Sequence, residues 1–192
     1  MGEAKKKMAA AREWRESLSP DEIVVADAAA KLFSAFVQPF QAMGMCYRLT
    51  FFLAEYLQDH HGISVVPIVG YINDGEGDIM ASHAWIELGG KKVDLALAFT
   101  EHPEAQLVGE VLILDRVTRP GVRYTYHRER SPEALRAIMR LRSDMKFATL
   151  ADHKEQEHLT MKARAQNPDL RRAYLDDAPD GFVYDRLVKL IE

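Results

Sequence analysis

A β-hairpin is the feature that most constrains how this chain can fold. Gly89 and Gly90 separate two segments with alternating apolar residues, 80–88 and 91–99, and a Gly-Gly pair favours a two-residue hairpin turn. The turn fixes a register that pairs apolar residues on one face and opposite charges on the other: Ile86 with Val93, Ala84 with Leu95, and Glu87 with Lys92. A slip of one residue would exchange the two faces, so the sequence predicts this register.

The charged face of the predicted hairpin also carries His83, Trp85 and Asp94. In this register Asp94 lies opposite Trp85 and diagonal to His83, at about 7–8 Å between the backbones, a distance that side chains can span. Taken alone, His83 would be a satisfied histidine on a half-exposed strand and Asp94 a surface carboxylate. Because the hairpin places both on one face, we expect them to share a hydrogen bond.

The only cysteine, Cys46, stands at the start of an apolar segment. Residues 47–59 contain no Gly or Pro, and their apolar side chains recur at helical spacing, which predicts a central, buried helix. The N-terminus of such a helix presents unpaired N–H groups and a positive dipole, which favour a thiolate, and Gly44 permits a sharp turn before it. Taken alone, a free cysteine is most often a small core residue.

Together these three residues meet the requirements of a cysteine nucleophile. The nucleophile needs a base that takes its proton, and the base needs a third group that fixes the tautomer and orientation of the imidazole. We therefore predict Cys46 as nucleophile, His83 as base and Asp94 as orienting residue. Such a site attacks an amide or ester carbonyl and forms a thioester, which water resolves by hydrolysis and an amine by acyl transfer.

Two further residues are candidates for roles in this site. The backbone N–H of Cys46 would hold the oxyanion, and Gln41 is the candidate for a second donor, with Gln38 behind it; an ordinary loop glutamine is the alternative for each. Trp85 is a candidate for lining a substrate groove or shielding the site from water. Plain packing under the flanking helices is the alternative for Trp85.

In the rest of the chain, residue patterns predict helices before and after the strands of a sheet. Ser19, Pro20 and Glu22 form a helix start signal, with an N-cap serine, a proline at the first helical position and a capping-box glutamate. Pro67 restricts its strand to an edge or a bulge. The expected helices are 2–18, 20–37, one that starts after Ser131-Pro132, 145–166 and one after 181, and the further strands are 63–72, 110–114 and 122–128.

Length and composition are those of a single globular domain. The chain has 192 residues, of which 47% are hydrophobic, enough for a substantial core. We expect one α+β domain over residues 1–192, with a catalytic-type core at 40–128 and helical extensions at 1–39 and 131–192.

Charge and motif content argue against several classes of partner. The net charge is −4, with basic residues scattered among acidic ones, so no nucleic-acid partner is expected. A single cysteine, no signal-peptide pattern and no apolar run of membrane-spanning length predict a cytoplasmic protein without a membrane partner. The spacings typical of metal sites and phosphate loops do not occur, so we expect neither a metal nor a cofactor.

Two other groups of residues are interpreted as structural. His153 and His158 lie on a charged helix at a spacing that gives them no common helical face, and we expect both to be solvated. Tyr124, Tyr126 and His127 are arranged as in an edge strand, with side chains alternating between its faces.

Several short motifs resemble the transglutaminase-like cysteine-enzyme superfamily. They lie within residues 40–100 and are Gly44-Met45-Cys46 at the start of the apolar helix, Val69-Gly70-Tyr71, Ser82-His83-Ala84-Trp85-Ile86-Glu87, and Val93-Asp94-Leu95. The resemblance implies a papain-like core, in which a cysteine-bearing helix packs on an antiparallel sheet and carries the nucleophile of a Cys-His-Asp triad. It also implies a thiol hydrolase or acyltransferase that acts on a peptide, a protein or a small amide. A non-catalytic binding module that retains the fold is the alternative from another class.

Overall fold

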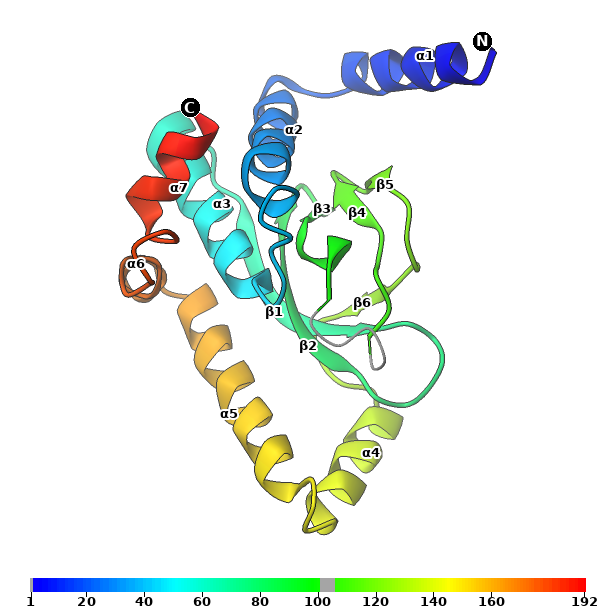
Figure 1. The fold of residues 1–192 in the computed structure, drawn as a ribbon, viewed down its shortest axis with the longest axis vertical. Coiled ribbons are helices and arrows are strands. Elements are labelled where there is room, and N and C mark those ends of the chain that lie inside the picture. Colours follow the sequence, from blue (N-terminus) through cyan, green and yellow to red (C-terminus); the bar gives the residue numbers. More distant parts are fainter. Residues whose placement is uncertain (1, 101–105) are drawn as a thin grey trace.

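The structure, a computed structural model, describes residues 2–100 and 106–192 as helices packed around one antiparallel sheet (Figure 1). This confirms the expected α+β class. The described sheet has six strands in the order β5-β4-β3-β2-β1-β6. The strands are β1 (Val66–Asn73), β2 (Ala81–Leu88), β3 (Lys91–Asp94), β4 (Val111–Ile113), β5 (Arg116–Arg119) and β6 (Thr125–His127).

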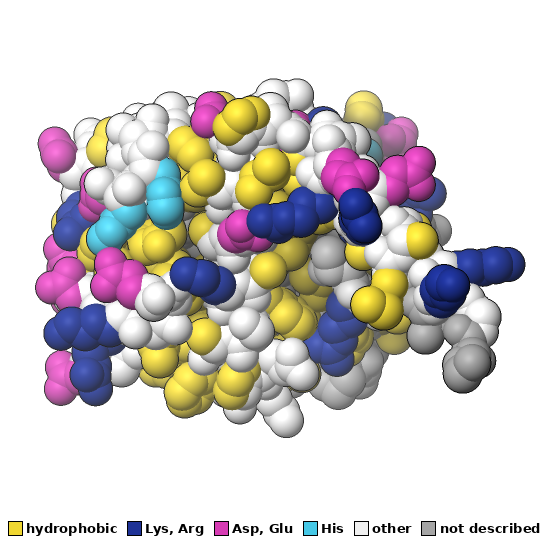
Figure 2. All heavy atoms as spheres, turned by 90° about the horizontal axis from the view of Figure 1, so that it is seen from above, with side chains coloured by type: hydrophobic (Ala, Val, Ile, Leu, Met, Phe, Trp, Pro, Cys, Tyr) yellow, Lys and Arg dark blue, Asp and Glu magenta, His cyan; other side chains and the backbone are white. Residues whose placement is uncertain are grey.

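Along the described residues, three α-helices precede the first strand and four follow the last strand. They are α1 (Gly2–Glu16), α2 (Pro20–Leu32), α3 (Cys46–His61), α4 (Pro132–Ser143), α5 (Ala148–Ala165), α6 (Pro168–Asp176) and α7 (Tyr184–Ile191), with a π-helical turn η1 (Phe33–Val37) and a 3-10 turn η2 (Ala96–Ala98). In Figure 1, α1 extends away at the top, and α4 and α5 form a V at the bottom. Seen from above, basic and acidic side chains are interspersed with apolar ones (Figure 2). No helix in the described ranges is both long and apolar enough to cross a membrane.

The predicted start signal of α2 is confirmed. Ser19 Oγ accepts a hydrogen bond from the Glu22 N–H at 3.3 Å, and Glu22 Oε2 accepts one from the Ser19 N–H at 2.9 Å. This reciprocal pair satisfies two of the donors that a helix N-terminus leaves free. The helical path continues from α2 through η1 and ends at Val37, as expected.

The cysteine-bearing helix α3 is the centre of the core, as predicted. It packs on β1 and β2, and α2, α6 and α7 contact its other sides. All its residues from Tyr47 to Leu57 are buried, so apolar contacts surround it rather than line one face. Gly62, in the left-handed conformation with φ of 65°, ends the helix.

The hairpin register is confirmed near the turn and is wrong beyond it. Leu88, Glu87 and Ile86 pair with Lys91, Lys92 and Val93, but the β2–β3 ladder ends there. The predicted strand 91–99 stops at Asp94, whose Oδ1 accepts the Ala96 N–H at 2.9 Å and turns the chain into η2. The pairs expected further along, Ala84 with Leu95 and Trp85 with Asp94, therefore do not form. On its other side β3 pairs with β4, where Asp94 lies opposite Leu112.

One edge of the sheet carries a strand that the sequence did not predict. β5 was not predicted; it pairs with β4 at the edge, after a turn in which Leu114 and Asp115 have positive φ. Pro67 lies in the half of β1 that β6 does not reach, because β6 pairs only with residues 71–73. The expectation that Pro67 restricts its strand to an edge or a bulge was wrong for β1 as a whole, which lies between β2 and β6, although Pro67 itself has no partner on the β6 side.

The C-terminal extension contains one helix that the sequence analysis missed. α5 ends before Asn167 as expected, but α6 follows at once. Asn167 Oδ1 accepts the Leu170 N–H at 3.2 Å, and Pro168 takes the first helical position. The Asn-Pro pair thus both ends one helix and starts the next.

We predict that Gly70→Ala separates β6 from β1 and destabilises the protein. A Cβ at Gly70 would lie 2.8 Å from Cη2 of Trp85 and would collide with the His127 carbonyl oxygen of β6. Overpacking of this kind costs about 1–3 kcal/mol, measurable by urea denaturation. The control is Gly77→Ala, where a Cβ would meet nothing within 4 Å. Equal stability of the two variants would contradict the prediction.

Candidate active site

The structure brings His83 and Asp94 together as the sequence predicted. His83 Nε2 donates a hydrogen bond to Asp94 Oδ2 at 2.7 Å. Both side chains are buried, with His83 4% and Asp94 2% exposed. The bond forms at the open end of the hairpin, just beyond the last β2–β3 pair, where β3 turns away from β2. The predicted contact is therefore correct, although the ladder that was expected to produce it is shorter.

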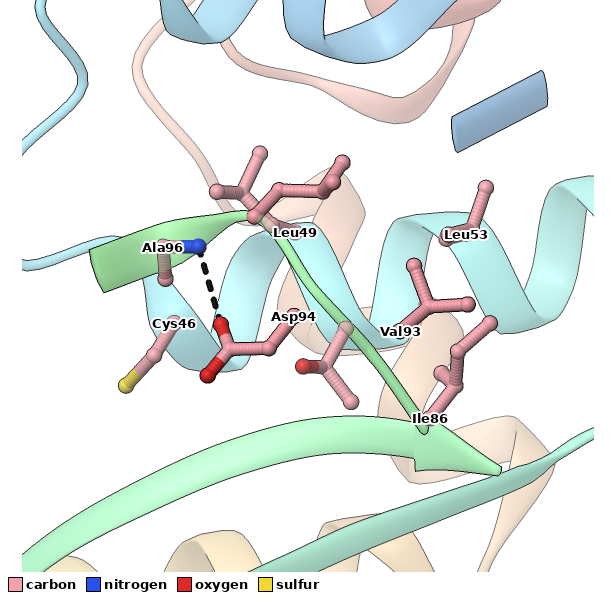
Figure 3. Close-up of a pocket in the computed structure, with 9 residues that line it drawn as sticks. Cys46, Leu49, Leu53, Ile86, Val93, Asp94 and Ala96 are labelled. Carbon is pink, nitrogen blue, oxygen red and sulfur yellow. Dashed lines mark hydrogen bonds between the residues drawn. The ribbon is translucent and has the colours of Figure 1, made fainter. Parts of the chain in front are cut away.

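Cys46 lies close to the His83–Asp94 pair and comes from helix α3. It is the first residue of α3 and is only partly buried. Figure 3 shows its side chain beside the Asp94 carboxylate at one end of a small cavity, with Leu53, Val93 and Ile86 at the other end. The cavity holds about 10 Å³, which is space for about one water molecule. Cysteine, histidine and aspartate are thus assembled from α3, β2 and β3.

The environment of His83 favours its charged form. Burial by itself would lower the pKa of the imidazole, but the charge and hydrogen bond of Asp94 act in the opposite direction. The nearby Cys46 side chain acts in the same direction as Asp94, and together they raise the pKa of His83 to about 10. The imidazole is therefore a cation at neutral pH, held between a carboxylate and a thiol.

Asp94 has a third donor that the sequence analysis did not assign. Tyr126 of β6 donates from its hydroxyl to Asp94 Oδ2 at 2.8 Å. The sequence placed Tyr126 correctly on an edge strand, but nothing in its alternation indicated a partner. Burial, and next the charge of Asp94, raise the pKa of the Tyr126 phenol, so it remains a donor across the neutral range.

A second hydrogen-bonded chain links the sequence neighbours of the site residues. Ser82 Oγ lies 2.8 Å from the Tyr47 hydroxyl and 2.6 Å from His158 Nδ1. Tyr47 follows Cys46 and Ser82 precedes His83, so the chain connects α3 and β2 beside the site. His158 belongs to α5, is 1% exposed and stacks on Tyr71. The expectation that His158 is solvated was wrong, because α5 packs this face of the helix on β1; His153 is exposed as expected.

The two remaining candidates lie apart from the triad's hydrogen bonds. Gln41 is exposed in the connection before α3, with a positive φ of 46°, and its role as an oxyanion donor stays a prediction. Trp85 is 2% exposed. Its indole donates to Glu87 at 2.9 Å and its ring packs edge-on against Tyr126 at 5.1 Å. A side chain this buried packs under the site instead of lining an open groove.

Tyr126 also lines a second, larger pocket of about 450 Å³. Its walls are charged, aromatic and aliphatic side chains of β3 to β6 and their connections, including Lys92, Glu110, Leu112 and Tyr124. Tyr126 contributes to this pocket and also contacts Asp94. In the described residues, no cluster of three or more His, Cys, Asp or Glu side chains is arranged to hold a metal ion.

We predict that His158 makes the protein less stable in acid. Burial, followed by the positive charge of Arg130, lowers the pKa of His158 below its ordinary value. The unfolded chain then binds the proton more readily, so the free energy of unfolding falls as the pH drops below about 6.5, by up to about 1.4 kcal/mol per pH unit. Urea denaturation between about pH 7.5 and pH 5 measures this slope. His158→Gln should flatten it, whereas His153→Gln, on the same helix, should leave it unchanged. Identical slopes in wild type and His158→Gln would contradict the prediction.

Three comparisons of the chain with known proteins found no match. The chain matches no protein-family model, no curated protein and no solved structure. A functional assignment therefore rests on the chemistry of the residues that the fold brings together.

Proposed function

We propose that this protein is a transglutaminase-like thiol enzyme that forms an acyl-enzyme on Cys46. Its substrate is a peptide, a protein or a small amide, and the thioester is resolved by water or by an amine. The observation that carries the proposal is the buried His83–Asp94 hydrogen bond, which holds a charged imidazole next to a thiol at a helix N-terminus. Those are the three groups that an activated cysteine nucleophile requires.

The mechanism follows from the proton on His83. The Cys46 thiolate attacks the carbonyl carbon of the substrate, and the π electrons of the carbonyl move to its oxygen. When the tetrahedral intermediate collapses, His83 gives its proton to the leaving amine, and the Cys46 thioester remains. A water or an amine then gives a proton to His83 and attacks the thioester, which releases the acid or the new amide and restores the thiolate.

The N-terminus of α3 supplies a place for the oxyanion. The first N–H groups of a helix have no acceptor within it, and Cys46 is the first residue of α3. Its backbone N–H is therefore free to donate to the carbonyl oxygen when the adjacent sulfur attacks. Gln41, in the connection that leads into α3, is our candidate for the second donor.

Asp94 has an orienting role in this proposal. Its carboxylate binds the Nε2 side of the imidazole, which leaves Nδ1 as the ring nitrogen for the thiol. Because the pair is buried, water does not compete for the carboxylate and the ring is held in one orientation.

The first prediction from this function concerns the reactivity of Cys46. An ordinary thiol is only about 0.3% thiolate at pH 6, so an imidazolium next to Cys46 should increase its reactivity most in acid. We expect iodoacetamide to label the wild type about tenfold or more faster than His83→Ala near pH 6, with convergence near pH 9. Mass spectrometry of the labelled protein gives the rates. His127→Ala, an exposed histidine that contacts Thr125, is the matched control and should behave as wild type. Slow labelling in wild type and His83→Ala, both with the midpoint of a free thiol, would exclude an activated nucleophile.

The second prediction concerns the acyl-enzyme itself. With activated esters or glutamine-containing peptides as donors, the wild type should gain the mass of one acyl group on Cys46, and Cys46→Ala should gain none. Asp94→Asn should acylate about 10²-fold more slowly or worse, because the imidazole loses its orienting partner. Partition of the acyl group between water and a labelled amine then distinguishes hydrolysis from transfer. A reactive thiol that accepts no acyl group from any donor would favour the non-catalytic binding module.

A further inference from the structure

We propose that Tyr126 is a positioning residue, which fixes the Asp94 carboxylate and limits how strongly it holds the proton of His83. The inference rests on the proposed function for its catalytic consequence, but the interaction itself is tested below without any substrate. Among the described residues, the Tyr126 hydroxyl donates to Asp94 and makes no hydrogen bond to the thiol or the imidazole. The Tyr126 ring lies 6.5 Å from the His83 ring, and Tyr126→Phe keeps this contact, so the role of the hydroxyl is one that acts through Asp94.

The geometry is that of two donors on one oxygen. His83 Nε2 and the Tyr126 hydroxyl both donate to Asp94 Oδ2, at 2.7 Å and 2.8 Å. The other oxygen, Oδ1, accepts the backbone N–H of Ala96 at 2.9 Å. The three donors come from β2, β6 and η2, and together they prevent the carboxylate from rotating.

This contact depends on the curl of the sheet. β3 and β6 are separated by β2 and β1 in the strand order, and a flat sheet would hold them about 14 Å apart. A tyrosine hydroxyl cannot cross that distance, so the hydrogen bond from Tyr126 to Asp94 requires the concave side of a curved sheet. The residues between them fit this curvature: Trp85 of β2 packs edge-on against the Tyr126 ring, and Gly70 of β1 provides the space for the indole.

The charges around the two residues leave Tyr126 as a neutral donor. Lys92 Nζ of β3 lies 6.0 Å from the centre of its ring, and burial, followed by the negative charges of Asp94, Glu110 and Asp115, disfavours the phenolate. The second partner of Asp94 Oδ2 is His83, which also interacts with Cys46 of α3. The carboxylate therefore shares its charge between a cation and a neutral hydroxyl.

Asp94 Oδ2 therefore divides its electron density between two donors, Tyr126 and His83, and this division sets the acidity of His83. While Tyr126 takes part of the electron density of that oxygen, His83 keeps enough acidity to protonate a leaving amine. Without the hydroxyl, the carboxylate charge would be directed to the imidazolium alone, and His83 would release its proton less readily. In the proposed mechanism this slows the acid-catalysed step and leaves the attack by the thiolate intact.

Tyr126→Phe in the full chain tests this role. NMR titration of the His83 imidazole, with its signal assigned by comparison with His83→Gln, should give a pKa about one unit higher than in wild type, the size expected for one hydrogen bond. Tyr124→Phe is the matched control: Tyr124 lies two residues away and donates to the backbone oxygen of Leu107. That control should leave the His83 titration unchanged. In the acyl-transfer assay, Tyr126→Phe should lower the rate of amine release about tenfold, with little change in iodoacetamide labelling.

The direction of the change in the His83 pKa decides whether the proposal holds. An unchanged or lower His83 pKa in Tyr126→Phe would overturn it, as would an equal shift in Tyr124→Phe. If Tyr126→Phe does not fold, replacement of Tyr126 by 3-fluorotyrosine gives the opposite test, because a more acidic phenol is a stronger donor and should lower the His83 pKa. The NMR readout requires no substrate. If Cys46 proves unactivated, the proposed function fails, while the effect of Tyr126 on His83 is still measured.

Discussion

The buried carboxylate of Asp94 is the interaction on which the rest of this structure depends. A carboxylate that is 2% exposed costs several kcal/mol unless its charge and its lone pairs are satisfied. Here a cationic imidazole, a phenol and a backbone N–H satisfy them, and each comes from a different element. The hairpin provides His83, the turn after β3 provides the Ala96 N–H, and the far edge of the sheet provides Tyr126. Removal of any one donor weakens the solvation of a charge that is buried in the core, so these three elements are fixed relative to one another.

The curl of the sheet connects this electrostatic requirement to packing. Gly70 has no side chain, which lets the Trp85 ring lie across β1. The indole in turn supports Tyr126, whose hydroxyl then reaches β3 across two intervening strands. Apolar packing and the hydrogen bond therefore favour the same curvature. A change at Gly70, which bears no functional group, is consequently expected to reach the site through β6.

The helices position the thiol against this sheet. α3 is surrounded by apolar contacts with β1, β2, α2, α6 and α7, so its N-terminus has a defined place at the open end of the hairpin. The hydrogen-bonded chain through Tyr47, Ser82 and His158 attaches α5 to the same end of α3 and β2. The C-terminal extension is therefore part of the framework that holds Cys46 next to His83.

Local patterns in the sequence determined the helix starts at Ser19 and Cys46, the Gly89-Gly90 turn, the register next to it, and the pairing of His83 with Asp94, which lies 11 residues away. Each depends on residues close in the chain, where periodicity and turn preferences act directly. The tertiary structure alone decided the contacts of Tyr126 with Asp94, 32 residues apart, and of His158 with Ser82, 76 residues apart. The physical reason is that these contacts follow from the curvature of the sheet and the docking of α5, which result from the packing of the whole core and leave no local signature in the sequence.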